Sequence, residues 1–202
     1  MFKKLICLYF IIFPGFLWAD GCLKYKQIPS TKILKTSYET HLVQPEEYMD
    51  KYHGNVVATL TEDYDVIVDV ISVNNGYCVV LKGIDAKIGY SDFLVKIDKS
   101  NKYNSCEYNA ILNHEYKHLG AYLSVIDDLE YDIKDSVFNA ANSIMPEFVT
   151  SREDIDGIIE KMNYKLREHP ELILLKQKIR AAQEIRNKRI DQNETGENLK
   201  KC

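Results

Sequence analysis

The sequence predicts an α+β fold, with a small, mainly antiparallel sheet that comes first and helices that follow, ending in a C-terminal helical hairpin. Three observations favour this class. Residues 55–97 are rich in β-branched runs separated by turn signals, residues 107–126 show helical periodicity, and residues 151–190 have the capping and apolar spacing of two further helices. A chain of 202 residues suits one domain with an appendage.

The strands are predicted from runs of valine and isoleucine. Glu62 and Asp63 interrupt the first such stretch, and Asn74-Asn75-Gly76 is typical of a tight turn. The expected strands are residues 56–60, 64–70, 77–82 and 93–97, with one or two shorter strands within residues 20–53.

A long helix is predicted directly after the last strand. Asn104 or Ser105 can cap its first turn, and Glu107 can close a capping box. Apolar residues at helical spacing continue to residue 126, a break is expected at residues 127–128, and more helix is expected over 129–143.

The last quarter of the chain predicts two more helices. One runs from a capping signal at residue 151 to about residue 167, and the other begins at Pro170 and continues to about residue 190, with a polar tail behind it. We therefore divide the chain into residues 20–150, an α+β domain, and 151–202, a helical extension. The extension either packs on the core as a hairpin or binds a partner.

The N-terminus predicts export. Lys3 and Lys4 precede an apolar run from Leu5 to Trp18, and Ala19 completes an acceptable cleavage site, so residues 1–19 are expected to be a signal peptide. An uncleaved membrane anchor and a lipoprotein acylated at Cys22 are the alternatives. The expected location is the periplasm or the exterior of the cell.

Charge and hydropathy exclude two classes of partner. The formal net charge is −4 and no basic patch is interleaved with aromatic residues, so nucleic acid is not expected as a partner. No segment after the N-terminal run is apolar enough to span a membrane, so the mature chain is expected to have no transmembrane helix.

Four cysteines would remain after cleavage, and an even number in an exported chain predicts two disulfides. The favoured pairing joins Cys78 to Cys106 and Cys22 to Cys202, and free thiols are the alternative. No pair has the C-x-x-C spacing of a zinc ribbon or a redox site.

Residues 114–118 read His-Glu-Tyr-Lys-His, a complete H-E-x-x-H motif. On a helix, His114 and His118 project from the same face one turn apart. Two imidazoles so placed can bind one Zn²⁺, and Glu115 can act as general base for a metal-bound water.

A hydrolytic zinc site also needs a third protein ligand and an open position. Glu130 is the expected third ligand, provided that the chain reverses soon after the motif helix. His53 and His41, from the strand region, are further options.

A strand region followed by a helix with His114-Glu115-x-x-His118 resembles the zincin superfamily of zinc metallopeptidases. Residues 89–94 and the segment Ser105-Cys106-Glu107-Tyr108 also look like an uncharacterised family of predicted exported proteobacterial proteins. This resemblance covers residues 55–125 and implies a zinc-dependent peptidase of the cell envelope. Positions 121 and 124 hold Ala and Ser, which excludes the metzincin pattern of Gly and His.

The expected function is therefore an exported zinc metallopeptidase that hydrolyses peptide bonds, either in periplasmic polypeptides or in cell-wall peptides. His114, His118 and Glu130 would bind the zinc, and Glu115 would act as the base. The alternative is a non-catalytic envelope protein that binds a partner through its helical C-terminal region. The sequence does not indicate an oligomeric state.

Overall fold

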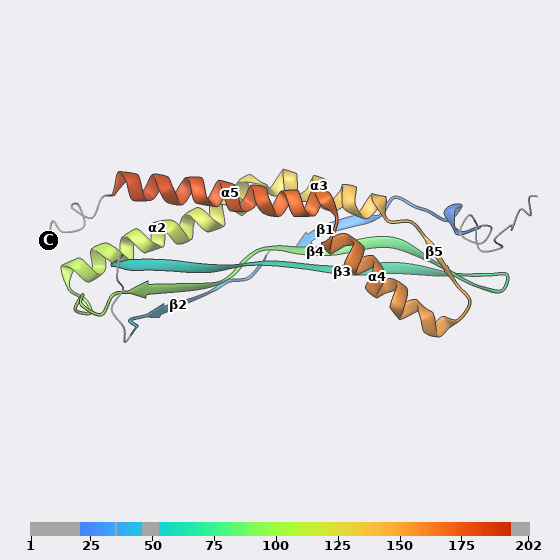
Figure 1. Ribbon diagram of the computed structural model, residues 1–202, viewed down its shortest axis with the longest axis horizontal. Coiled ribbons are helices and arrows are strands. Elements are labelled where there is room, and N and C mark those ends of the chain that lie inside the picture. The colour runs from blue at the N-terminus through green and yellow to red at the C-terminus, as the bar shows by residue number, and fades with distance from the viewer. Residues whose placement is uncertain (1–20, 35, 46–52, 195–202) are drawn as a thin grey trace, which may run out of the picture.

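The structure is a computed structural model that describes residues 21–34, 36–45 and 53–194. The molecule is elongated and consists of a twisted sheet with helices packed on one of its faces (Figure 1). The expected signal peptide, residues 1–19, lies outside the described residues.

Two very long antiparallel strands form the centre of the sheet. Strand β3 (Gly54–Val73) and strand β4 (Gly76–Ile97) are joined by a two-residue turn, in which Asn75 has a φ of 69°. Asparagine tolerates this left-handed conformation, which the turn requires. The strand is not interrupted at Glu62 and Asp63 as expected, and both residues pair with β4. The charge of Glu62 is compensated by an ion pair with Lys176.

The other edge of β4 is covered by three short strands, one after another. They are β5 (Glu147–Val149), β1 (Ser30–Leu34) and β2 (Glu39–Val43), which pair with residues 77–79, 83–87 and 92–96 of β4. Strands β1 and β2 are parallel to β4, whereas β5 is antiparallel to it. The prediction of a small, mainly antiparallel sheet is therefore wrong: half of the pairings in the described part of the chain are parallel, although the α+β class fits.

The direction of β1 and β2 has a simple physical origin. The tight turn forces β3 and β4 to be antiparallel, whereas β1 and β2 come before this hairpin and reach the far edge of β4 by longer connections. Alternation of apolar and polar residues reports which face of a strand is buried, and it carries no information on strand direction.

The predicted helices are present, and their starts are close to the predicted ones. Ser105 caps the first long helix, because its side-chain oxygen accepts a hydrogen bond from the backbone N–H of Tyr108. The helices are α2 (Cys106–Asp128), α3 (Glu130–Ser143), the short 3₁₀ turn η1 (Arg152–Asp154), α4 (Ile155–Arg167) and α5 (Pro170–Asn193).

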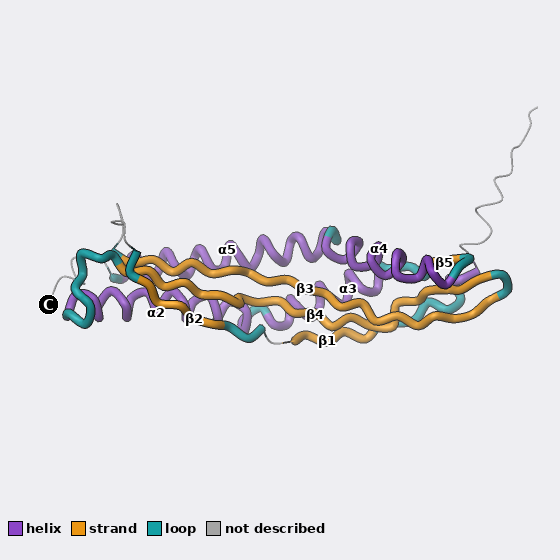
Figure 2. The backbone as a smooth tube through the Cα atoms, turned by 90° about the horizontal axis from the view of Figure 1, so that it is seen from below, coloured by secondary structure: helices purple, strands orange, loops and turns teal. Residues whose placement is uncertain are grey.

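All four long helices pack on the same side of the sheet. Figure 2 shows the strands from the opposite side, with α2 and α3 behind them and α5 beyond β3. Alternate residues of β4, such as Ile84, Ala86 and Ile88, are buried beneath these helices. The same core includes Met162 of α4 and Leu175 of α5, so both C-terminal helices pack on the sheet domain.

The disulfide pairing differs from the favoured one. Cys22 is bonded to Cys78, and Cys106 is also disulfide-bonded, whereas Cys202 lies outside the described residues. Cys78 and Cys106 cannot meet because they lie at opposite ends of β4, whose 22 residues span roughly 70 Å at about 3.3 Å per residue. A buried disulfide fits an oxidising compartment. In the described part of the chain, none of the helices has both the length and the apolar character needed to cross a membrane.

Candidate metal site

The H-E-x-x-H residues lie in the middle of α2, where helical geometry separates them into two directions. His114 and His118 face helix α5, and Glu115, about 100° further round the helix, faces strand β3. All three side chains are buried, with 8%, 8% and 4% of their respective residue surfaces exposed. The motif thus places the two imidazoles on the side of α2 that faces α5 and the carboxylate on the neighbouring side, which faces the sheet.

Helix α5 runs antiparallel to α2 and brings a second set of polar residues to the histidines. Arg186 contacts Ser124 and Asp128 near the end of α2, whereas Glu194 contacts His114 nearer its middle. Asn187, Asp191 and Glu194 are spaced four and three residues apart. This spacing puts them on one face of α5, towards α2.

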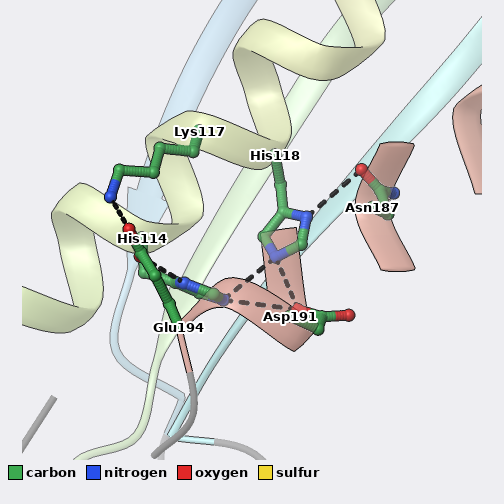
Figure 3. A network of polar contacts seen from close by, with 6 residues as sticks. All are labelled: His114, Lys117, His118, Asn187, Asp191 and Glu194. Atoms are coloured by element: carbon green, nitrogen blue, oxygen red, sulfur yellow. Dashed lines mark hydrogen bonds and ion pairs between the residues drawn. The ribbon is translucent and has the colours of Figure 1, made fainter. Parts of the chain in front are cut away.

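Asp191 joins the two histidines in a compact group (Figure 3). Nε2 of His114 lies 3.0 Å from Nε2 of His118. Oδ1 of Asp191 lies 3.4 Å from Nε2 of His114 and 3.0 Å from Nε2 of His118. Three ligand atoms at about 2.0–2.2 Å from a tetrahedral zinc ion would be roughly 3.3 Å apart, so the triangle has the size that zinc requires.

The outer nitrogen of each ring is held by an oxygen from α5. Nδ1 of His114 lies 3.0 Å from Oε2 of Glu194, which also pairs with Lys117, and Nδ1 of His118 lies 3.2 Å from Oδ1 of Asn187. Carboxylate and carbonyl oxygens only accept, so the proton of each neutral ring is on Nδ1. Both Nε2 atoms are then lone-pair donors that face each other and the Asp191 carboxylate.

Three electron-pair donors at this separation repel one another unless a cation lies among them. The group of His114, His118 and Asp191 could therefore hold a metal ion. Imidazole ligands favour zinc, copper, nickel or iron over magnesium and calcium, which prefer oxygen. The Asp191 side chain is 61% exposed, so the group is reached by solvent on the α5 side.

Glu115 lies beside this group in an apolar environment. Burial raises the pKa of its carboxyl to about 7, which His114 partly opposes and Asp191 reinforces. A carboxyl group with a pKa near neutrality is suited to accept and return a proton at physiological pH.

Tyr122, one turn after His118, reaches the same polar network. Its hydroxyl is hydrogen-bonded to the Asn187 side chain, which also holds His118. Burial is the main reason that the pKa of Tyr122 is raised, so this hydroxyl keeps its proton at neutral pH.

Glu130, the expected third ligand, is not brought to the histidines. Helix α2 continues to Asp128, about 15 Å along its axis from His118, and Glu130 lies beyond that end, at the start of α3, where it pairs with Lys134. The two other options are also elsewhere: His41 is exposed on β2 beside Glu39, and His53 is exposed just before β3.

Sequence reasoning missed Asn187, Asp191 and Glu194. They lie 69 to 80 residues from their histidine partners, in a segment whose polar composition predicts a solvated helix end. Their spacing on one face of α5 was the signal available, but such a stripe is common on exposed helices.

Comparisons with known proteins add no relative: no family model, no curated protein and no solved structure matches the chain.

Proposed function

We propose that the protein is a zinc-dependent hydrolase of peptide bonds, in which His114, His118 and Asp191 hold the metal. The observation that supports this most strongly is the convergence of two imidazole nitrogens and one carboxylate oxygen to within 3.4 Å, beside a buried glutamate. Two histidines and one carboxylate leave a position open for water or substrate, as in known catalytic zinc sites.

Each residue around the group has a separate task in this proposal. Zinc, when bound, lowers the pKa of a bound water and polarises a carbonyl. Glu115 accepts a proton from the attacking water and returns it to the leaving amine. Glu194 and Asn187 keep the ring protons on Nδ1, so that the Nε2 atoms remain available as ligands.

The cellular context in the proposal is the cell envelope. The Cys22–Cys78 disulfide supports an oxidising compartment, and the apolar N-terminal run agrees with export. The substrates would then be polypeptides of that compartment.

A non-catalytic role is the second candidate, and one observation favours it. Asn187 and Asp191 belong to the last two turns of α5 and Glu194 is the residue that caps it, so a metal at this site would also fasten the end of α5 to α2. In that case the ion would stabilise the C-terminal region for binding a partner, and no substrate would be cleaved.

The first test is metal content, measured by mass spectrometry on the purified protein beside Asp191→Asn and Glu130→Gln. We expect about one zinc per chain in the unaltered protein and in Glu130→Gln, and a loss of most of the zinc in Asp191→Asn. Equal zinc in all three would contradict the assignment of Asp191, and zinc in none would overturn the site.

The second test separates the hydrolase from the scaffold. The zinc-loaded protein is incubated with a peptide library derived from a digested proteome, and new termini are identified by mass spectrometry. We expect cleavage by the unaltered protein and none by Glu115→Gln, which should keep its zinc. Zinc binding without any cleavage would favour the scaffold.

A further inference from the structure

A cavity lies away from the candidate metal group, where the row of short strands is interrupted. Strand β1 pairs with β4 as far as Lys87, and β2 pairs from Asp92, so residues 88–91 have no partner strand on this edge in the described part of the chain. A cavity of about 330 Å³ opens here, between the sheet and helices α2 and α3. Its apolar lining consists mainly of Ile33, Leu34, Ile88, Leu123, Ile126 and Ile133.

Two residues of the lining carry buried hydroxyl groups that have no hydrogen-bond partner among the described residues. They are Thr36 and Tyr90, whose side-chain oxygens are inaccessible to solvent. Tyr90 is only 4% exposed, so its hydroxyl cannot turn out to water. Because neither oxygen is accessible to water, neither faces the open space of the cavity, and a ligand there meets mainly apolar side chains.

The mouth of the cavity is acidic. Asp127, Glu130 and Lys134 line it, and Glu130 and Lys134 form an ion pair with each other. Asp127 is exposed and has no ion pair among the described residues. The mouth therefore has one uncompensated negative charge, which favours a cationic group.

We propose that this cavity binds a small cationic amphiphile, with its alkyl body among the isoleucine and leucine side chains and its ammonium group at Asp127. The volume lies within the range of small-molecule sites.

The proposed site is independent of the metal group. Asp127 is nine residues beyond His118 on the same helix, a distance of about 13 Å along its axis. Binding at the cavity is therefore tested without reference to zinc or to hydrolysis.

The test is a titration with n-octylamine, n-octanol and n-octanoate, followed by NMR of protein labelled at the isoleucine and leucine methyl groups. We expect saturable shifts at Ile88, Ile126 and Ile133, and none at the remote Ile155. Octylamine should bind roughly two- to fivefold more tightly than octanol, as one exposed ion pair allows, and octanoate should bind most weakly.

Two variants complete the experiment. Ile126→Trp should fill the cavity and abolish the shifts at Ile88. Asp127→Asn, an exposed change that leaves the lining intact, should remove the preference for octylamine over octanol and keep the binding of octanol. Shifts that do not saturate, or that spread equally to Ile155, would overturn the site, and tightest binding of octanoate would overturn the cationic ligand.

Discussion

The carboxylate of Glu115 lies directly against the backbone of Gly54, at the start of β3. A Cβ atom at position 54 would come within 2.5 Å of Oε1 of Glu115 and within 2.6 Å of a methyl carbon of Ile111. The absence of a side chain at position 54 thus allows the motif helix to lie close to the sheet, with Glu115 enclosed between them.

Replacing Gly54 by alanine should therefore destabilise the protein. The added methyl group must displace Glu115 and Ile111, and overpacking of this kind costs about 1–3 kcal/mol in the free energy of unfolding. Urea denaturation measures the change. Gly120→Ala is the matched control, because a Cβ there meets no atom of the described residues within 4 Å and alanine favours the helix by about 0.5–1 kcal/mol. Equal stability of the two variants would contradict the close approach.

The raised pKa of Glu115 predicts a specific pH dependence of stability in the metal-free protein. The carboxyl has a pKa of about 7 when folded and of about 4.5 in the unfolded chain. Between these values the folded state binds the proton that the unfolded state has released, so the contribution of Glu115 to stability falls as the pH rises, and is constant above about 7.

Glu115→Gln should remove this loss. The free energy of unfolding of the variant, relative to that of the unaltered protein, should be greater at about pH 8 than at about pH 4.5 by on the order of 1–3 kcal/mol. Urea denaturation with a chelator present measures both values. Glu107→Gln changes an exposed glutamate of the same helix and should show no comparable gain. A Glu115→Gln variant whose relative stability is the same at both pH values would show that burial does not perturb this carboxyl.

The hydrogen bond from His118 to Asn187 predicts an effect on metal affinity. Removing the amide oxygen in Asn187→Ala frees the ring to rotate and to change its tautomer, and losses of this kind weaken metal binding by about 10- to 100-fold. Competition with a chromophoric zinc chelator measures the affinity. Lys188→Ala, an exposed change at the next position of α5, should bind zinc as the unaltered protein does. Identical affinities in both variants would exclude this role for Asn187.

The sequence predicted those features of the fold and of the candidate site that depend only on residues close together in the chain. Ser105 and the spacing of His114 and His118 are local features, and they predict the capped helix and two of the three residues of the metal group. The position of Asp191 beside the histidines depends on the antiparallel packing of α5 against α2, which a local sequence pattern does not predict. Glu130 was a wrong choice of third ligand because it assumed a chain reversal that the long α2 helix does not make.

In the sheet, too, the features set by neighbouring residues were predicted, and those set by contacts between distant segments were not. The turn at Asn75 and the β-branched runs predict the β3–β4 hairpin. The parallel placement of β1 and β2 and the Cys22–Cys78 pairing depend on how distant segments meet, so periodicity could not predict them.

The Cys22–Cys78 disulfide should stabilise the fold without affecting the candidate metal site. It joins residues separated by 56 positions, and the loss of loop entropy from the unfolded chain corresponds to about 4 kcal/mol for a loop of that length. The double variant Cys22→Ser, Cys78→Ser should therefore lose up to about 4 kcal/mol in the free energy of unfolding, measured by denaturant titration.

The same variant should keep its zinc affinity under conditions where it remains folded. Cys78 lies near the start of β4, whereas the histidines lie above its opposite end, close to Gly54 and Ile97. The two measurements are therefore independent. Unchanged stability would contradict the role of the disulfide, and a loss of zinc binding in the folded variant would show that the two ends of the sheet are coupled.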